Sequence, residues 1–187
     1  MTEATRQAGA ALAAGAGASF HWAAKTLHWV IAVLVFAVLP LGIMQKMVQD
    51  EYYGAVNFLH ESLGGAIFLL MLLRLLVRWT TRTPGPAPGT PGWAVRLAGW
   101  VQRLLYALLL GEPILGHLTG SAQGFPLVWL HLVPVWTPIG KSDAAVHILL
   151  PMHGLVALLI VLLIVLHIAG ALYHRIVLRD DTLARMT

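Results

Sequence analysis

The chain has 187 residues, of which 58% are hydrophobic and only 11% are charged. A soluble domain carries about 25% charged residues, so this composition excludes an ordinary soluble protein and indicates an integral membrane protein. The absence of cysteine excludes disulfides, thiolate metal sites and covalently attached c-type haem. A net charge of +4 is typical of membrane topology rather than of nucleic-acid binding, and we expect no nucleic-acid partner.

Residues 1–20, MTEATRQAGAALAAGAGASF, are rich in alanine and glycine and contain a single leucine. Such a stretch is too weakly apolar for the hydrophobic region of a secretory signal. We predict a disordered N-terminal tail over residues 1–20, in the cytoplasm, followed by one membrane domain over residues 21–187.

Four later segments are apolar over the roughly 20 residues that a helix needs to cross a bilayer. They show no alternation of apolar and polar residues, which favours helices over strands. The predicted spans cover residues 25–45, 57–79, 97–117 and 147–175. A Pro/Gly-rich linker (80–92) and a longer loop (118–146) complete the prediction, which is an all-α, transmembrane, antiparallel four-helix bundle.

The cations divide unequally between the two predicted faces. Ten of the twelve Lys and Arg residues fall on the face that holds both termini and the 80–92 linker, and only Lys46 and Lys141 fall on the other. The ten are Arg6, Lys25, Arg74, Arg78, Arg82, Arg96, Arg103, Arg175, Arg179 and Arg185. The positive-inside rule therefore predicts that both termini are cytoplasmic.

Four of the nine histidines lie within predicted spans: His28, His60, His153 and His167. An imidazole buried in lipid is costly unless it has a partner. His153 and His167 are fourteen residues apart, so they share one helix face at depths about 21 Å apart. Depth then pairs His153 with His60 near the outer side, and His167 with His28 near the cytoplasmic side.

Two histidines that face each other across a helical bundle can ligate one iron porphyrin. The four histidines therefore suggest two six-coordinate haems b. The alternatives are hydrogen-bonded or proton-relay histidines, or another metal, although two histidines alone make a poor zinc site. Small residues next to the histidines would let a flat macrocycle approach the backbone, or would serve plain helix packing; they are Gly64, Gly65, Gly154 and Gly170.

Two further residues are candidates at the cytoplasmic side. Arg74 follows His60 by fourteen residues, and a buried arginine needs an anion, which a haem propionate would supply; the alternative is snorkelling to lipid phosphate, which suits Arg78 better. His174 lies two turns after His167 at the interface, where it would bind a quinone carbonyl or relay protons. A solvated interfacial histidine is the competing interpretation.

Two acidic residues, Glu61 and Glu112, fall near the outer boundary of their spans. Each is a candidate to orient a haem-ligand imidazole or to carry protons, and packing near water explains them equally well. The remaining histidines are interpreted as loop or interface residues; they are His21, His117, His131 and His147.

Several short motifs in a fixed order now carry a family resemblance. They are LHW at 27–29, HESLGG at 60–65 with LLRLLVR at 72–78, MHG at 152–154, LHIAGALYH at 166–174 and LRDDTLARM at 178–186. Over residues 20–187 the chain resembles the bacterial cytochrome b561 family of four-helix di-haem membrane proteins. The resemblance implies two haems b ligated by His28, His60, His153 and His167, electron exchange with ubiquinone, and a place in the bacterial inner membrane. His174 matches a family histidine implicated at the quinone site.

The resemblance leaves two functions to compare. Some relatives are similar to superoxide oxidases, which take electrons from periplasmic superoxide and pass them to ubiquinone. Others are cytochrome subunits that relay electrons for a periplasmic partner, a dehydrogenase or hydrogenase. Lys141 and Asp143 are the only charges of the 118–146 loop, so a strongly basic trap for superoxide is not evident there. No side chain is assigned as catalytic, because the redox chemistry belongs to the cofactor.

Overall fold

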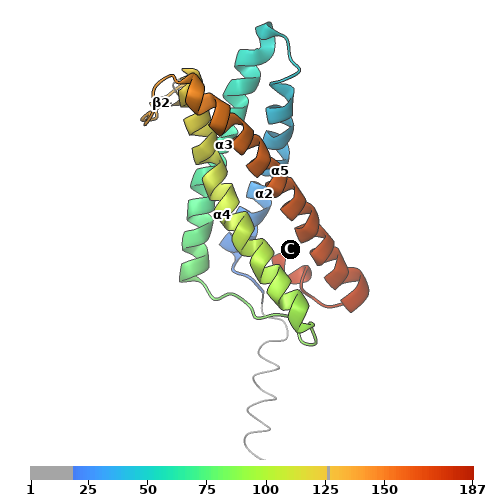
Figure 1. The fold of residues 1–187 in the computed structure, drawn as a ribbon. Coiled ribbons are helices and arrows are strands. Elements are labelled where there is room, and N and C mark those ends of the chain that lie inside the picture. The colour runs from blue at the N-terminus through green and yellow to red at the C-terminus, as the bar shows by residue number, and fades with distance from the viewer. Residues whose placement is uncertain (1–18, 126) are drawn as a thin grey trace, which may run out of the picture.

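The structure is a computed structural model that describes residues 19–125 and 127–187. Four long helices run antiparallel through it: α2 (Trp22–Met44), α3 (Asp50–Thr80), α4 (Gly92–Gln123) and α5 (Asp143–Tyr173) (Figure 1). The all-α four-helix architecture predicted from hydropathy is confirmed. Most of the predicted 1–20 tail, residues 1–18, lies outside the described residues.

Three of the helices are long and apolar enough to cross a membrane: α2, α3, and α5 together with its continuation to Leu178. In α4 the leucine-rich run is interrupted by polar residues such as Gln102 and Glu112. At about 1.5 Å per residue, α3 and α4 exceed the roughly 30 Å of a bilayer core. Both helices are therefore long enough to extend beyond the lipid.

The predicted helix ends need correction where the helices continue past the apolar runs. The second span was expected to start at residue 57, but α3 begins at Asp50; the third was expected to end at 117, but α4 continues to Gln123. Hydropathy locates the part of a helix that lies in lipid, whereas the backbone hydrogen bonds continue into the interface. Gly124, with φ of 90°, ends α4 in the left-handed conformation typical of a helix C-terminus.

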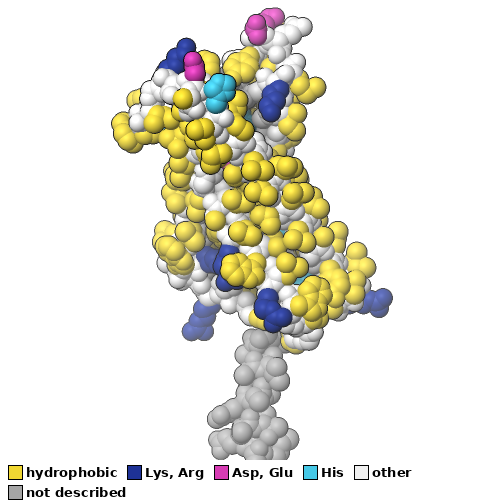
Figure 2. All heavy atoms as spheres, in the orientation of Figure 1, with side chains coloured by type: hydrophobic (Ala, Val, Ile, Leu, Met, Phe, Trp, Pro, Cys, Tyr) yellow, Lys and Arg dark blue, Asp and Glu magenta, His cyan; other side chains and the backbone are white. Residues whose placement is uncertain are grey.

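The helices pack in chain order, α2 on α3, α3 on α4, and α4 on α5. The core lies between α2 and α3, where Leu27, Ile31 and Val35 meet Ile67 and Met71. Hydrophobic side chains cover the middle of the outer surface and charged side chains gather toward its ends (Figure 2). This distribution is the one expected of a bundle that is surrounded by lipid.

The loop between α4 and α5 folds back onto α3. Its two short strands, β1 (Val128–Trp129) and β2 (Val133–Pro134), pair antiparallel. The Trp129 indole donates a hydrogen bond to the Ser62 carbonyl at 3.0 Å. A Cβ added at Gly65 would lie 2.6 Å from Trp129 Nε1. Gly65 therefore accommodates this indole, which is the packing alternative for this glycine.

The C-terminal segment returns to the start of α2 through the π-helix η1 (His174–Leu178) and the 3₁₀-helix η2 (Ala184–Met186). The Met186 carbonyl accepts from the Trp29 indole at 3.0 Å and the Thr187 carbonyl from Lys25 Nζ at 2.7 Å. Both ends of the described chain thus lie at one end of the bundle. We call it the inner end, following the predicted orientation, and the opposite end the outer end.

Candidate functional site

The four histidines within the helices meet in two pairs. The rings of His60 on α3 and His153 on α5 have centroids 6.1 Å apart and planes at 88°. The rings of His28 on α2 and His167 on α5 also have centroids 6.1 Å apart, with planes at 72°. We call these the outer pair and the inner pair. These are the pairs that depth predicts, and α5 contributes one histidine to each.

The spacing within each pair fits a metal ion held between two imidazoles. A metal–nitrogen bond is about 2 Å long and the nitrogen lies about 1 Å from its ring centroid, so two rings on one metal have centroids about 6 Å apart. Both pairs have this separation. The residues present therefore fit bis-histidine ligation at two depths, while the ligand role of each histidine stays a prediction.

In the outer pair, one nitrogen of each ring already faces an acceptor. His60 Nδ1 lies 3.2 Å from the Val38 carbonyl of α2, and His153 Nδ1 lies 3.0 Å from Glu112 Oε1 of α4. A histidine that ligates a metal characteristically donates its other ring N–H to a carbonyl or carboxylate. In both rings Nε2 is then the nitrogen left for a metal.

Two glycines that sequence reasoning did not select hold the outer rings closely. A Cβ at Gly42 of α2 would lie 3.0 Å from His60 Cε1, and one at Gly116 of α4 would lie 3.1 Å from His153 Cε1. The glycines that were selected behave differently, since a Cβ at Gly64, Gly154 or Gly170 would meet no atom within 4 Å. These three positions face open space in the structure, and their role beside a cofactor stays a prediction.

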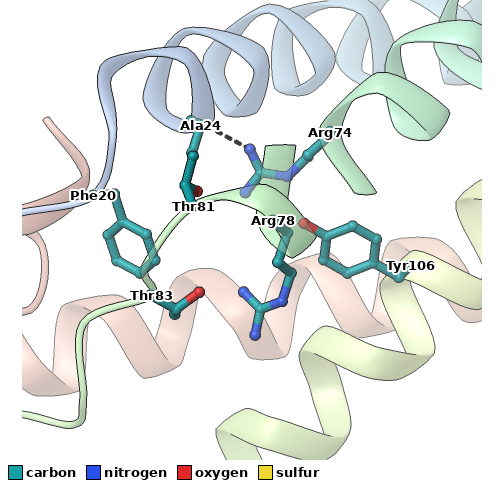
Figure 3. A pocket seen from close by; sticks show the side chains of 7 residues that line it. All are labelled: Phe20, Ala24, Arg74, Arg78, Thr81, Thr83 and Tyr106. Carbon is teal, nitrogen blue, oxygen red and sulfur yellow. Dashed lines mark hydrogen bonds between the residues drawn. The ribbon is translucent and has the colours of Figure 1, made fainter. Parts of the chain in front are cut away.

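At the inner end, Arg74 of α3 contacts the first turn of α2. Its guanidinium donates to the Ala24 carbonyl, one turn before His28, at 2.6 Å. It lines a small pocket together with Phe20, Ala24, Arg78, Thr81, Thr83 and Tyr106 (Figure 3). Among the described residues no carboxylate pairs with Arg74, so no side-chain anion neutralises it there.

His174 is enclosed by the C-terminal segment instead of being solvated. Its side chain is 13% exposed, and Nδ1 lies 2.6 Å from Asp180 Oδ2 and 3.2 Å from the Thr182 hydroxyl. Partial burial raises the pKa of Asp180, but the hydrogen bonds from Thr182 and His174 outweigh it and hold that pKa below its ordinary value. Sequence reasoning missed both partners, although the DDT of LRDDTLARM follows His174 closely.

The other histidines have local contacts. The His21 side chain caps α2, His117 Nε2 lies 2.9 Å from the Trp136 carbonyl, and His131 stacks on Phe58 with centroids 3.9 Å apart. His117 lies within α4 and His147 within α5, and the interpretation of these four histidines as loop or interface residues stays a prediction. Glu61 faces α4, where its Oε1 lies 3.6 Å from a Cβ placed at Gly120, and no hydrogen bond or ion pair among the described residues joins it to a paired imidazole.

Comparison with known proteins agrees with this geometry. The family model described as prokaryotic cytochrome b561 matches residues 19–187. Cytochrome b561 homolog 2 of Escherichia coli (strain K12) is 31% identical over 162 residues, covering 85% of this chain and 86% of the relative. Cytochrome b562 of Cereibacter sphaeroides is 32% identical over 169 residues, and the probable superoxide oxidase CybB of Yersinia pestis is 29% identical over 160; each comparison covers 86% of this chain and 90% of the relative. The chain belongs to the prokaryotic cytochrome b561 family, and is a multi-pass, haem b-class electron-transfer cytochrome of the bacterial inner membrane.

Proposed function

We propose that this cytochrome carries electrons from a periplasmic donor, superoxide, through two haems b to ubiquinone. The observation that carries the proposal is the presence of two histidine pairs at two depths, each with ring centroids 6.1 Å apart. A haem held by two imidazoles supplies reversible one-electron iron chemistry. The relative described as a probable superoxide oxidase supports the choice of donor.

The chain's own residues hold and orient the two groups. His60 and His153 are the proposed ligands of the outer haem, and His28 and His167 those of the inner haem. Residues 21–187 act as one membrane domain, with the 1–20 tail and the C-terminus in the cytoplasm. The concentration of ten cations on that face supports this orientation.

His174 is the proposed contact for ubiquinone at the inner end. Asp180 engages its Nδ1 at 2.6 Å, which leaves Nε2 for a quinone carbonyl oxygen. With Nδ1 held by the carboxylate, the ring presents Nε2 to the quinone, where it can exchange a hydrogen bond and a proton with the reduced quinone.

A second candidate function is that of an electron-transfer subunit for a periplasmic dehydrogenase or hydrogenase. The surface of the loop between α4 and α5 favours it. That loop carries one cation, Lys141, and exposes large apolar side chains, with Leu132 78% and Trp136 80% exposed. Such a surface suits contact with a protein better than electrostatic capture of a small anion.

The first experiment is haem content per chain in detergent-purified protein, by pyridine haemochrome and a reduced-minus-oxidised spectrum. We expect two haems b per chain. Colourless protein from haem-replete cells would contradict the proposal and leave a haem-free transporter or scaffold. With haem present, ubiquinone reduction driven by a superoxide-generating system distinguishes the two functions, because a relay subunit shows no such activity without its partner.

A further inference from the structure

Two side chains of opposite charge border the two histidine pairs. Glu112 lies beside the outer pair, with Oε1 3.0 Å from His153 Nδ1, and the side chains of His153 and Glu112 are only 23% and 13% exposed. Within the described residues, neither the two carboxylate oxygens of Glu112 nor His153 Nδ1 makes a hydrogen bond, so their 3.0 Å contact is a close approach of charge-bearing groups. A buried carboxylate is costly unless it is compensated, and the His153 ring is the partner that offers compensation.

On the side of α3 and α4 the inner end carries cations instead, and the two carboxylates of the C-terminal segment, Asp180 and Asp181, are paired with His174 and Arg185. Arg74 donates to the Ala24 carbonyl, one turn before His28, at 2.6 Å, and Arg74 and Arg78 each place a guanidinium 5.9 Å from the centroid of the Tyr106 ring. The sequence contains no Asp or Glu between Glu61 and Glu112. The α3–α4 connection therefore brings only positive side chains to the inner end.

A carboxylate and a guanidinium shift the reduction potential of a nearby redox site in opposite directions. A carboxylate on the Nδ1 side makes a ligating imidazole more basic and stabilises the oxidised, more positive state of the site. A nearby guanidinium stabilises the reduced state, which has gained an electron. Both effects are larger in the low-dielectric interior of a membrane protein than in water. His60, whose Nδ1 faces the neutral Val38 carbonyl, adds no opposing charge at the outer pair.

We propose that Glu112 and Arg74 are positioning residues that set a lower reduction potential at the outer pair than at the inner pair. The inference rests on the proposed function, because it requires a haem at each pair. One electron then moves inward favourably: the outer site is oxidised by one electron and the inner site is reduced by the same electron, without proton transfer or bond breakage. If Arg74 also pairs with a haem propionate, replacing Arg74 leaves that anion uncompensated. This too would lower the inner reduction potential.

The test is a potentiometric titration of the purified two-haem protein, with the components assigned in a His153→Ala protein that retains the inner haem. Glu112→Gln should raise the lower potential and leave the other unchanged. Arg74→Gln should lower the higher potential and leave the other unchanged. We expect each substitution to change the equilibrium between the sites by about tenfold, which is about 59 mV for a one-electron couple.

Two matched variants test whether the shifts in reduction potential come from the specific contacts of Glu112 and Arg74. The alternatives are loss of a charge anywhere in that half of the bundle, or loss of the fold. Glu61→Gln removes a carboxylate from the same half of the bundle without touching a paired imidazole, and should shift the outer potential less than Glu112→Gln does. Arg74→Lys keeps the cation but loses the planar fork that reaches Ala24, and should retain most of the inner potential even if Arg74→Gln fails to assemble.

Three results would overturn the inference: an outer potential that is the higher one in the unaltered protein, equal shifts for Glu112→Gln and Glu61→Gln, or no shift for Glu112→Gln in protein with two haems. Each of these leaves the haem proposal standing. Protein that purifies without haem removes the proposed function itself, and the inference with it.

Discussion

The outer and inner histidine pairs have the same spacing but different surroundings. The outer rings are fixed by the Val38 carbonyl, the Glu112 carboxylate and the close backbone of Gly42 and Gly116. The inner rings have no such acceptor among the described residues. The inner pair lies instead next to the α2–α3 core and the Arg74 cation.

Two sites that share helix α5 are therefore held differently: the outer rings by short contacts, and the inner rings by core packing next to a cation. Rings held by contacts of 3.0–3.2 Å are oriented before a cofactor binds, which lowers the entropy cost of binding. Rings without such contacts are less fixed in orientation, and the reduction potential of a group bound between them depends more on nearby charge. We therefore expect the outer pair to respond most to changes of shape and the inner pair most to changes of charge.

The largest expected effect is the loss of one haem when one ligand is removed. His153→Ala deletes half of the outer pair and leaves the inner rings, 6.1 Å apart, in place. We expect haem content to fall from two per chain to one, measured by pyridine haemochrome. Equal loss at both pairs in a protein that keeps its helical circular dichroism would contradict the assignment of one haem to each pair.

Much of this arrangement follows from sequence because it depends on depth along a helix. Apolar runs locate the helices, and the fourteen-residue spacing of His153 and His167 places them on one face at two depths. The pairing of His28 with His167 then needs only the antiparallel order of the helices.

What sequence did not predict depends on how each helix is rotated about its axis. The sequence allows several roles for Glu112 and does not single out Gly116, because the side of α4 that faces α5 is set by packing along the whole helix. The docking of Trp129 on Gly65 is similarly non-local. Hydropathy predicts which residues are buried in lipid or protein, but not which side chains they contact.

The next effect tests whether shape controls the outer pair. Gly116→Val adds a side chain where a Cβ alone would lie 3.1 Å from His153 Cε1, so the ring must move. We expect a lower haem content in the outer pair and an unchanged inner haem. Gly111→Val is the matched control on α4, because a Cβ there meets no atom within 4 Å. Equal effects of the two variants would mean that helix stability, and not ring contact, is responsible.

A smaller effect is expected at the segment that closes the inner end. Arg185 is 6% exposed, donates to the Gly85 carbonyl at 3.0 Å and pairs with Asp181 at 2.9 Å. Arg185→Ala should free the C-terminal segment locally, at a cost of about 1.5–3 kcal/mol for a hydrogen-bonded charged group. Limited proteolysis should then cleave residues 179–187 faster while the outer haem spectrum is unchanged. A change in the outer spectrum would contradict the independence of the two ends.

The smallest effect is the pH dependence of the same segment. Because the pKa of Asp180 in the folded protein is held below its ordinary value, its contacts with His174 and Thr182 add stability above about pH 4. That contribution is lost only as the pH falls through the depressed folded value. Pepsin digestion between pH 2 and pH 5 should therefore cleave residues 179–187 faster toward the acid end.

Asp180→Asn is the matched variant for this measurement. It keeps a side-chain oxygen near Thr182 but removes the carboxylate that engages His174, so its cleavage should depend less on pH after correction for the activity of pepsin on an unfolded substrate. The outer pair has no counterpart of this segment, and its spectrum should be the same in both proteins. If the unaltered protein and Asp180→Asn share one pH profile, Asp180 does not hold the segment, and the enclosure of His174 must come from packing alone.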